Sequence, residues 1–299
     1  MLSESAVNCA SVQHVIGYTA YMFRTIRHTF ELMKMSLRLL QKDRELILFP
    51  IMSAIGLIVM LGMFLGLAAG TGTLDRLDAA SRVGTDAAEP VDYVLAVALY
   101  IGASFVVIFF NSALIAAALE RLRGGDPNIG SGLRAAAAHL PAIIGWAIIA
   151  GTVGLLLQML RNRTDNFLAR LAIGLVGGAW AYMTFFVIPV LVAEGIGPID
   201  AIKRSGSLVR ETWGRQAASS FGFGIVYLIA GVVAVVPAVL LFAVSPVLGI
   251  IVGAITIPIA IGTVQAMEGI FKAALYEFAL GESPLEFDSK TLSGAYRAL

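Results

Sequence analysis

The sequence predicts an all-α membrane protein, a bundle of six transmembrane helices with amphipathic helices on the cytoplasmic side. The first observation behind this is composition: 58% of the 299 residues are hydrophobic, 14% are charged, and the mean hydropathy is +0.85. Soluble domains are roughly half apolar and a quarter charged. The second observation is a series of long segments without any charged residue. Because 21 Lys and Arg nearly balance 20 Asp and Glu, the net charge gives no indication of nucleic acid as a partner.

Uncharged windows locate the spans, because an ionised side chain is costly in the hydrocarbon core of a bilayer. Four windows have the length of one transmembrane helix, about 20 residues or somewhat more. The fifth has 52 residues, so we expect two helices there, with a break near residues 242–246, where Ser245 precedes Pro246. The five windows cover residues 46–74, 93–119, 140–160, 171–193 and 216–267.

The distribution of Lys and Arg predicts the orientation. Sixteen of the 21 lie in the N-terminal arm, the second and fourth connections and the C-terminal end, and five lie in the first and third connections. By the positive-inside rule, both termini are cytoplasmic in a multi-pass protein of the cell membrane. We expect a cytoplasmic arm over residues 1–45, a transmembrane domain over 46–276 and a cytoplasmic tail over 277–299. Residues 71–92, which are acidic, are expected to form a solvated, partly mobile outer loop.

The N-terminal arm carries an amphipathic pattern that predicts a helix in the plane of the lipid head groups over residues 21–42. Such a helix either anchors the protein to anionic lipids or caps the bundle. Its apolar stripe consists of Met22, Ile26, Phe30, Met33, Leu37 and Leu40, and its polar stripe of Arg24, Arg27, Glu31, Lys34, Arg38 and Gln41.

The spacing of basic segments predicts three helical-hairpin repeats. An amphipathic or basic stretch precedes the first, third and fifth spans, and Lys34-x-Ser36-x-x-Leu39 matches Lys203-x-Ser205-x-x-Leu208. Repeats of this kind occur in transporters, although simple duplication of a hairpin explains the pattern equally well. Rows of small residues predict close contacts between helices. These rows are Gly62, Gly66 and Gly70, then Gly174 and Gly178, and finally Gly249 and Gly253.

Polar residues within or beside the spans are the candidates for a functional site. Gln265, Glu268 and Lys272 are spaced i, i+3 and i+7 on one helical face, and Glu268 precedes Lys272 in the order that favours an ion pair. Asn111 lies within the second span, and Glu194 ends the fourth. These residues form either a polar cavity or a set of interfacial charges with one hydrogen bond between helices. We expect the interfacial arrangement, with a Glu268–Lys272 coupling energy below about 1 kcal/mol.

No group of residues predicts catalysis or metal binding. The histidines His14, His28 and His139 are scattered without a metal-ligand spacing, and Cys9 is the single cysteine. The sequence also lacks a nucleophile elbow and a phosphate-binding loop that follows a strand. We therefore expect no enzyme activity, no cofactor and no metal.

Three segments at the ends of the predicted spans carry characteristic residues. They are Lys42-Asp43-Arg44-Glu45-Leu46 with Phe49-Pro50, residues 194–214, and residues 269–283 with Phe287-Asp288. On these segments the chain resembles an uncharacterised family of bacterial and archaeal six-span integral membrane proteins, over most of the chain after about residue 25. Residues 197–208 are more distantly similar to the membrane domain of some glycerophosphodiester phosphodiesterases. The resemblance implies a helical membrane module concerned with lipid or envelope upkeep, and no specific activity.

Two classes of function follow from these observations. The first is a non-enzymatic envelope protein that organises lipids or acts as a scaffold, which the basic amphipathic segments and the small-residue rows favour. The alternative is a transporter or channel subunit with a polar site on the sixth span. The expected partners are membrane lipids, other membrane proteins or further copies of the chain, and not nucleic acid.

Overall fold

The predicted fold class is confirmed: a computed structural model describes residues 34–83, 89–213 and 221–282, and within these ranges it contains helices and no strand. Six segments are long and apolar enough to cross a membrane, which agrees with the six predicted spans. Residues 34–42 are helical and precede a single 3-10 helix, η1 (Arg44–Ile47). The α-helices are α2 (Leu48–Gly70), α3 (Thr73–Val83), α4 (Pro90–Leu122), α5 (Ile129–Ala138), α6 (Leu140–Asn162), α7 (Phe167–Met183), α8 (Val187–Glu194), α9 (Pro198–Trp213), α10 (Phe221–Val244) and α11 (Pro246–Ala279).

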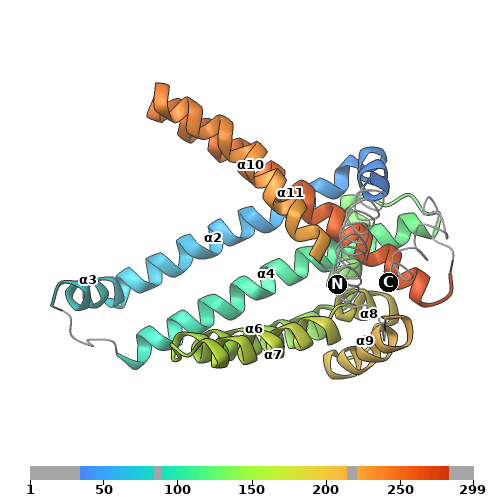
Figure 1. Cartoon of the computed structure of the whole chain (residues 1–299), viewed down its shortest axis with the longest axis horizontal. Coiled ribbons are helices and arrows are strands. Elements are labelled where there is room, and N and C mark those ends of the chain that lie inside the picture. Colours follow the sequence, from blue (N-terminus) through green and yellow to red (C-terminus); the bar gives the residue numbers. More distant parts are fainter. Residues whose placement is uncertain (1–33, 84–88, 214–220, 283–299) are drawn as a thin grey trace, which may run out of the picture.

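The long helices form three hairpins, and a shorter helix precedes each of them. The first hairpin pairs α2 with α4, the second pairs α6 with α7, which α8 follows along the chain, and the third pairs α10 with α11. The helix over residues 34–42, then α5, then α9 precede them in turn, as the predicted repeats require. Figure 1 shows the first two hairpins side by side, whereas the third diverges from them.

The predicted break in the fifth window is confirmed at Ser245. Helix α10 ends at Val244, and Pro246 is the first residue of α11, a position where the missing proline N–H removes no helical hydrogen bond. The turn is tight because Gly249 lies directly against the backbone of Phe242, where a Cβ atom would overlap it. Pro237 lies inside α10 and Pro258 inside α11 without ending either helix.

The buried core lies at the end of the molecule opposite the hairpin tips. Helix α4 is buried mainly from Ser112 onward, and α11 mainly from Gly262 onward, whereas their first halves expose many apolar side chains. Helices α8 and α9 and residues 34–42 complete this cluster, which we call the base core. Its largest fully buried side chains include Leu39, Phe49 and Tyr276.

The fourth predicted span, expected as one helix, is broken between α7 and α8. Pro189 explains the break, because its ring crowds the Phe185 carbonyl and offers that oxygen no N–H donor. Ser205 of α9 satisfies the backbone groups that the break leaves open. Its hydroxyl accepts a hydrogen bond from the Phe186 N–H at 3.0 Å and donates one to the Met183 carbonyl oxygen at 2.7 Å.

The prediction of a loop over residues 71–92 is wrong for half of that segment, because Thr73–Val83 form helix α3. Asp92, at the start of α4, fastens α3 to the hairpin. It accepts hydrogen bonds from Arg76 at 2.6 and 3.1 Å and from the Thr73 hydroxyl at 2.6 Å. The hydrogen bonds to Asp92 raise the pKa of Arg76 above its ordinary value. One of the acidic residues from which solvation was predicted, Asp92, is therefore buried and holds α3 against α4.

Two of the three predicted small-residue rows make no close helix contact within the described residues. A Cβ atom would meet no neighbouring atom within 4 Å at Gly62, Gly66, Gly70, Gly174 or Gly178. The first row lies on another face of α2, which packs on α4 through Gly56, where a Cβ atom would lie 3.0 Å from Val106. The third row does form a contact, because a Cβ atom on Gly253 would lie 3.3 Å from Ala238.

The predicted amphipathic arm, residues 21–42, falls outside the described residues up to residue 33. In the part that is described, Lys34, Arg38 and Gln41 are exposed, whereas Leu40 is buried. Leu39, which the predicted apolar stripe does not include, is fully buried in the base core. This last part of the arm therefore packs against protein.

The two matched repeat serines give a direct test of the Ser205 interaction. Ser205→Ala leaves the Phe186 N–H and the Met183 carbonyl without their partner, so we expect the free energy of unfolding to fall by about 1–3 kcal/mol. Ser36 is equally buried, and its hydroxyl has no hydrogen-bond partner among the described residues. Ser36→Ala should therefore be neutral or stabilising. Thermal unfolding in nanodiscs measures both changes. Equal effects of the two substitutions would contradict a stabilising role for the hydrogen bonds of Ser205.

Candidate functional site

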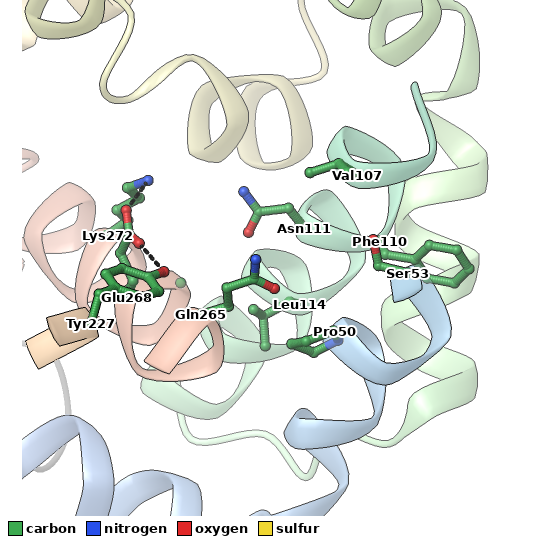
Figure 2. A pocket seen from close by; sticks show the side chains of 11 residues that line it. Pro50, Ser53, Val107, Phe110, Asn111, Leu114, Tyr227, Gln265, Glu268 and Lys272 are labelled. Carbon is green, nitrogen blue, oxygen red and sulfur yellow. Dashed lines mark hydrogen bonds and ion pairs between the residues drawn. The ribbon is translucent and has the colours of Figure 1, made fainter. Parts of the chain in front are cut away.

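The polar residues of the last span line a cavity of about 200 Å³ where the first and third hairpins meet (Figure 2). Four helices contribute to it, and they come from both hairpins. The lining residues are Pro50 and Ser53 of α2, Val107, Phe110, Asn111 and Leu114 of α4, Tyr227 of α10, and Gln265, Glu268, Gly269 and Lys272 of α11. We call this cavity the junction pocket.

An ion pair and a tyrosine hydroxyl form one wall of the junction pocket. The Lys272 Nζ atom lies 2.7 Å from Glu268 Oε1, and the Tyr227 hydroxyl donates a hydrogen bond of 2.8 Å to Glu268 Oε2. The side chains of Lys272 and Glu268 are 24% and 29% exposed. The pair is therefore more enclosed than the interfacial arrangement expected from the sequence.

Two side-chain amides lie beside this ion pair. Asn111 comes from α4 and Gln265 from α11, and in Figure 2 their amide groups face each other across the pocket. Neither amide has a hydrogen bond to any residue that the structure describes. The two helices approach closely at this level because Gly269 packs against Leu114, where a Cβ atom would lie 2.6 Å from its Cδ2.

The broken fourth span contacts Lys272, a lining residue of the junction pocket. The ring of Phe185, at the break, has its centroid 5.6 Å from Lys272 Nζ, a cation–π distance. Because Ser205 bonds the backbone on both sides of Phe185, α9 holds this ring against the lysine. The position of Lys272 thus depends on the break as well as on its own helix.

Glu194, the fifth candidate, lies outside the junction pocket. Its Oε1 accepts hydrogen bonds from Arg204 at 3.1 Å and from the Tyr276 hydroxyl at 3.0 Å. It joins the end of α8 to α9 and α11. Glu277, next to Tyr276 in the chain, forms a second cross-link, to Arg123 at 2.7 Å. These contacts fasten the helices of the base core, which is a structural role.

Sequence reasoning missed Tyr227 and Ser53. Both lie inside windows that were identified by the absence of charged residues. Because a hydroxyl group carries no charge, this criterion does not distinguish Ser or Tyr from the apolar residues of a span. A signal was nevertheless available, because Tyr227 is the single tyrosine of residues 216–267 and tyrosine combines an apolar ring with a polar tip.

The junction pocket is suited to binding a polar group. It offers an ammonium group, a carboxylate that already has two donors, and two amides on an otherwise mainly apolar wall. Its lining contains no His or Cys side chain. Among the residues that the structure describes, no three His, Cys, Asp or Glu side chains gather as metal ligands would.

A model of the family of unknown function DUF6159 matches residues 91–284, about two thirds of the chain, so the chain belongs to this family. Its predicted membership of a family without known function is confirmed at that level. No curated protein and no solved structure matches the chain. The matched range includes the pocket residues of α4, α10 and α11, and it excludes Pro50 and Ser53 of α2.

The enclosure of the ion pair predicts a measurable coupling energy. In a double-mutant cycle of Glu268→Gln and Lys272→Met, we expect a coupling above about 1 kcal/mol, because each single change leaves a partly desolvated charge unpaired. The matched control is Asp78–Arg82, which has the same i,i+4 spacing and a distance of 2.8 Å, with side chains 58% and 74% exposed. Its cycle should give about 0.5 kcal/mol or less. Similar values for both pairs, from unfolding in nanodiscs, would contradict this prediction.

Proposed function

We propose that the protein binds membrane lipids, with the polar head group of a lipid in the junction pocket and its acyl chains along the apolar faces of the hairpins. The observation that carries this proposal is the place of the pocket: polar side chains from two hairpins meet where those hairpins begin to diverge (Figures 1 and 2). The proposal makes the chain a non-enzymatic lipid-organising protein.

The depth of the junction pocket supports a head-group site. A bilayer's hydrocarbon core takes about 20 residues of helix. The helix ends far from the base core are the last residue of α2 and the first residues of α4 and α11. Counted from these ends, Ser53 lies 17 residues along α2, Asn111 lies 21 along α4, and Gln265 lies 19 along α11. All three helices therefore bring the pocket to the level at which hydrocarbon gives way to head groups.

The size of the pocket and the surface around it support the same ligand class. A cavity of about 200 Å³ is smaller than the pockets of roughly 300–1,000 Å³ that enclose drug-sized molecules, so only part of a lipid enters it. Apolar side chains on the neighbouring helix surfaces are exposed, among them Ile58 of α2, Leu228 of α10 and Ile259 of α11. Such surfaces favour acyl chains.

The base core, on this proposal, faces the cytoplasm. Of the 16 Lys and Arg that the structure describes, 11 belong to segments at that end of the spans, as the positive-inside rule requires of a cytoplasmic side. Residues 197–208, at the same end of the spans, supply the buried face of α9, including Ala201, Ser205 and Leu208.

Lipid that co-purifies with the protein tests the proposal. In mild detergent, the double variant Asn111→Leu with Gln265→Leu should retain several-fold less lipid by native mass spectrometry, because the pocket loses both amides. Thr263→Val is the matched control, since Thr263 lies on the same helix, is absent from the pocket lining and bonds only the Ile259 carbonyl of its own helix. Equal lipid retention by the double variant and the native protein would reject the pocket as the binding site.

Reporter fusions test the orientation. A tag inserted at residue 80, in α3, should be accessible only from outside the cell, and a tag at the C-terminus only from the cytoplasm, because the basic segments stay on the cytoplasmic side. Protease protection or a compartment-sensitive reporter measures both positions. The reverse pattern would place the base core outside.

Transport of the bound group is a second candidate function, and the broken fourth span favours it. Discontinuous helices line the central sites of many transporters, and the break here places Phe185 against Lys272. Reconstituted liposomes with a labelled lipid distinguish the two: movement of the label between leaflets that Lys272→Met abolishes supports transport, and binding without movement supports lipid organisation.

A further inference from the structure

We infer that the junction pocket recognises the phosphate group of a phospholipid, bound by the Lys272 ammonium and the amide N–H groups of Asn111 and Gln265. This inference rests on the proposed lipid-binding function and names the chemical class of the head group. It follows from which hydrogen-bonding groups of the pocket are already used and which are available to a ligand.

The acceptors on the charged wall are already engaged. Glu268 Oε1 accepts from Lys272 and Glu268 Oε2 accepts from Tyr227, at 2.7 and 2.8 Å. Each carboxylate oxygen thus has a strong donor. A cationic ligand would have to displace or share these contacts, so the wall is better suited to a ligand that brings acceptors.

Donors, in contrast, are available. An ammonium group has three N–H bonds, and Lys272 contacts one carboxylate oxygen and one ring face, that of Phe185. Each amide of Asn111 and Gln265 adds two N–H bonds, and neither is bonded to a residue that the structure describes. Figure 2 shows the Lys272, Asn111 and Gln265 side chains around the same cavity.

The charge of the pocket selects among acceptor-rich groups. Glu268 and Lys272 neutralise each other, so the lining has no net charge to attract a multiply charged anion. A phosphodiester carries one negative charge and two unesterified oxygens, which match one ammonium and two amides. Because this group is common to anionic and zwitterionic phospholipids, we expect selection for the phosphate and little selection for the alcohol esterified to it.

Binding of two lipids with identical acyl chains tests the inference on the full chain in detergent. The probes are dioleoyl phosphatidylethanolamine and dioleoylglycerol, which differ by the phosphate-containing head group, and native mass spectrometry measures both affinities. We expect the phospholipid to bind at least tenfold more tightly. The double variant Glu268→Gln with Lys272→Met should lose this preference and keep its affinity for dioleoylglycerol, because it removes the ammonium and preserves an acceptor for Tyr227.

Control variants and a soluble probe separate the possible results. Thr263→Val should retain the full preference, and Asn111→Leu should lose part of it, which tests the site independently if the double variant does not fold. Equal affinity of the native protein for both lipids would overturn the phosphate inference and leave lipid binding intact, whereas binding of neither would overturn the proposed function. If inorganic phosphate displaced the phospholipid at equal concentration, phosphate recognition would stand and a lipid ligand would not.

Discussion

The structure depends on the mismatch between the length of two helices and the thickness of a membrane. Helices α4 and α11 have 33 and 34 residues, about 50 Å at 1.5 Å per residue, whereas a hydrocarbon core is about 30 Å thick. Roughly two fifths of each helix therefore extend beyond the apolar layer. Because both extend at the same end, these portions pack on each other and on α8, which in turn packs on α9, and the base core results.

The polar groups of the junction pocket lie where the helices pass from the apolar layer into the base core. Helix surfaces that face lipid have no partner for a charged or hydrogen-bonding side chain, and the base core is closely packed with apolar ones. Between these zones, side chains of the first and third hairpins line one cavity. Within the third hairpin, Glu268 has Lys272 of its own helix and Tyr227 of α10 as partners. The junction pocket is thus a product of the same length mismatch that creates the core.

Much of the fold was predictable from local chemistry. Charged residues delimit the spans, and the Ser245-Pro246 pair identifies the turn of the third hairpin. Both predictions depend only on residues close together in the sequence: the first on the cost of a charge in the hydrocarbon core, the second on the missing N–H of proline. The break near Phe185 was not predicted, since a proline inside an apolar window ends a helix only where another element supplies hydrogen bonds. That element is Ser205 of α9, which is distant along the chain.

The candidate site was predictable in its composition and not in its geometry. Helical spacing placed Gln265, Glu268 and Lys272 on one face, but it did not show which helix that face meets. The pocket exists because Asn111 of α4 and Tyr227 of α10 come to the same level, a contact between segments far apart in sequence. Glu194, with an equally polar side chain, meets Tyr276 and Arg204 instead.

The single hydroxyl of Ser205 also limits which sequences this fold accepts. Position 205 needs a small side chain that donates one hydrogen bond and accepts another, a combination that Ser and Thr provide among the small residues. Its repeat counterpart, position 36, is just as buried, and its hydroxyl has no partner among the described residues. Two segments with the same sequence pattern therefore differ in what they tolerate: position 36 can become alanine, whereas position 205 is held to a hydroxyl by the backbone groups that it joins.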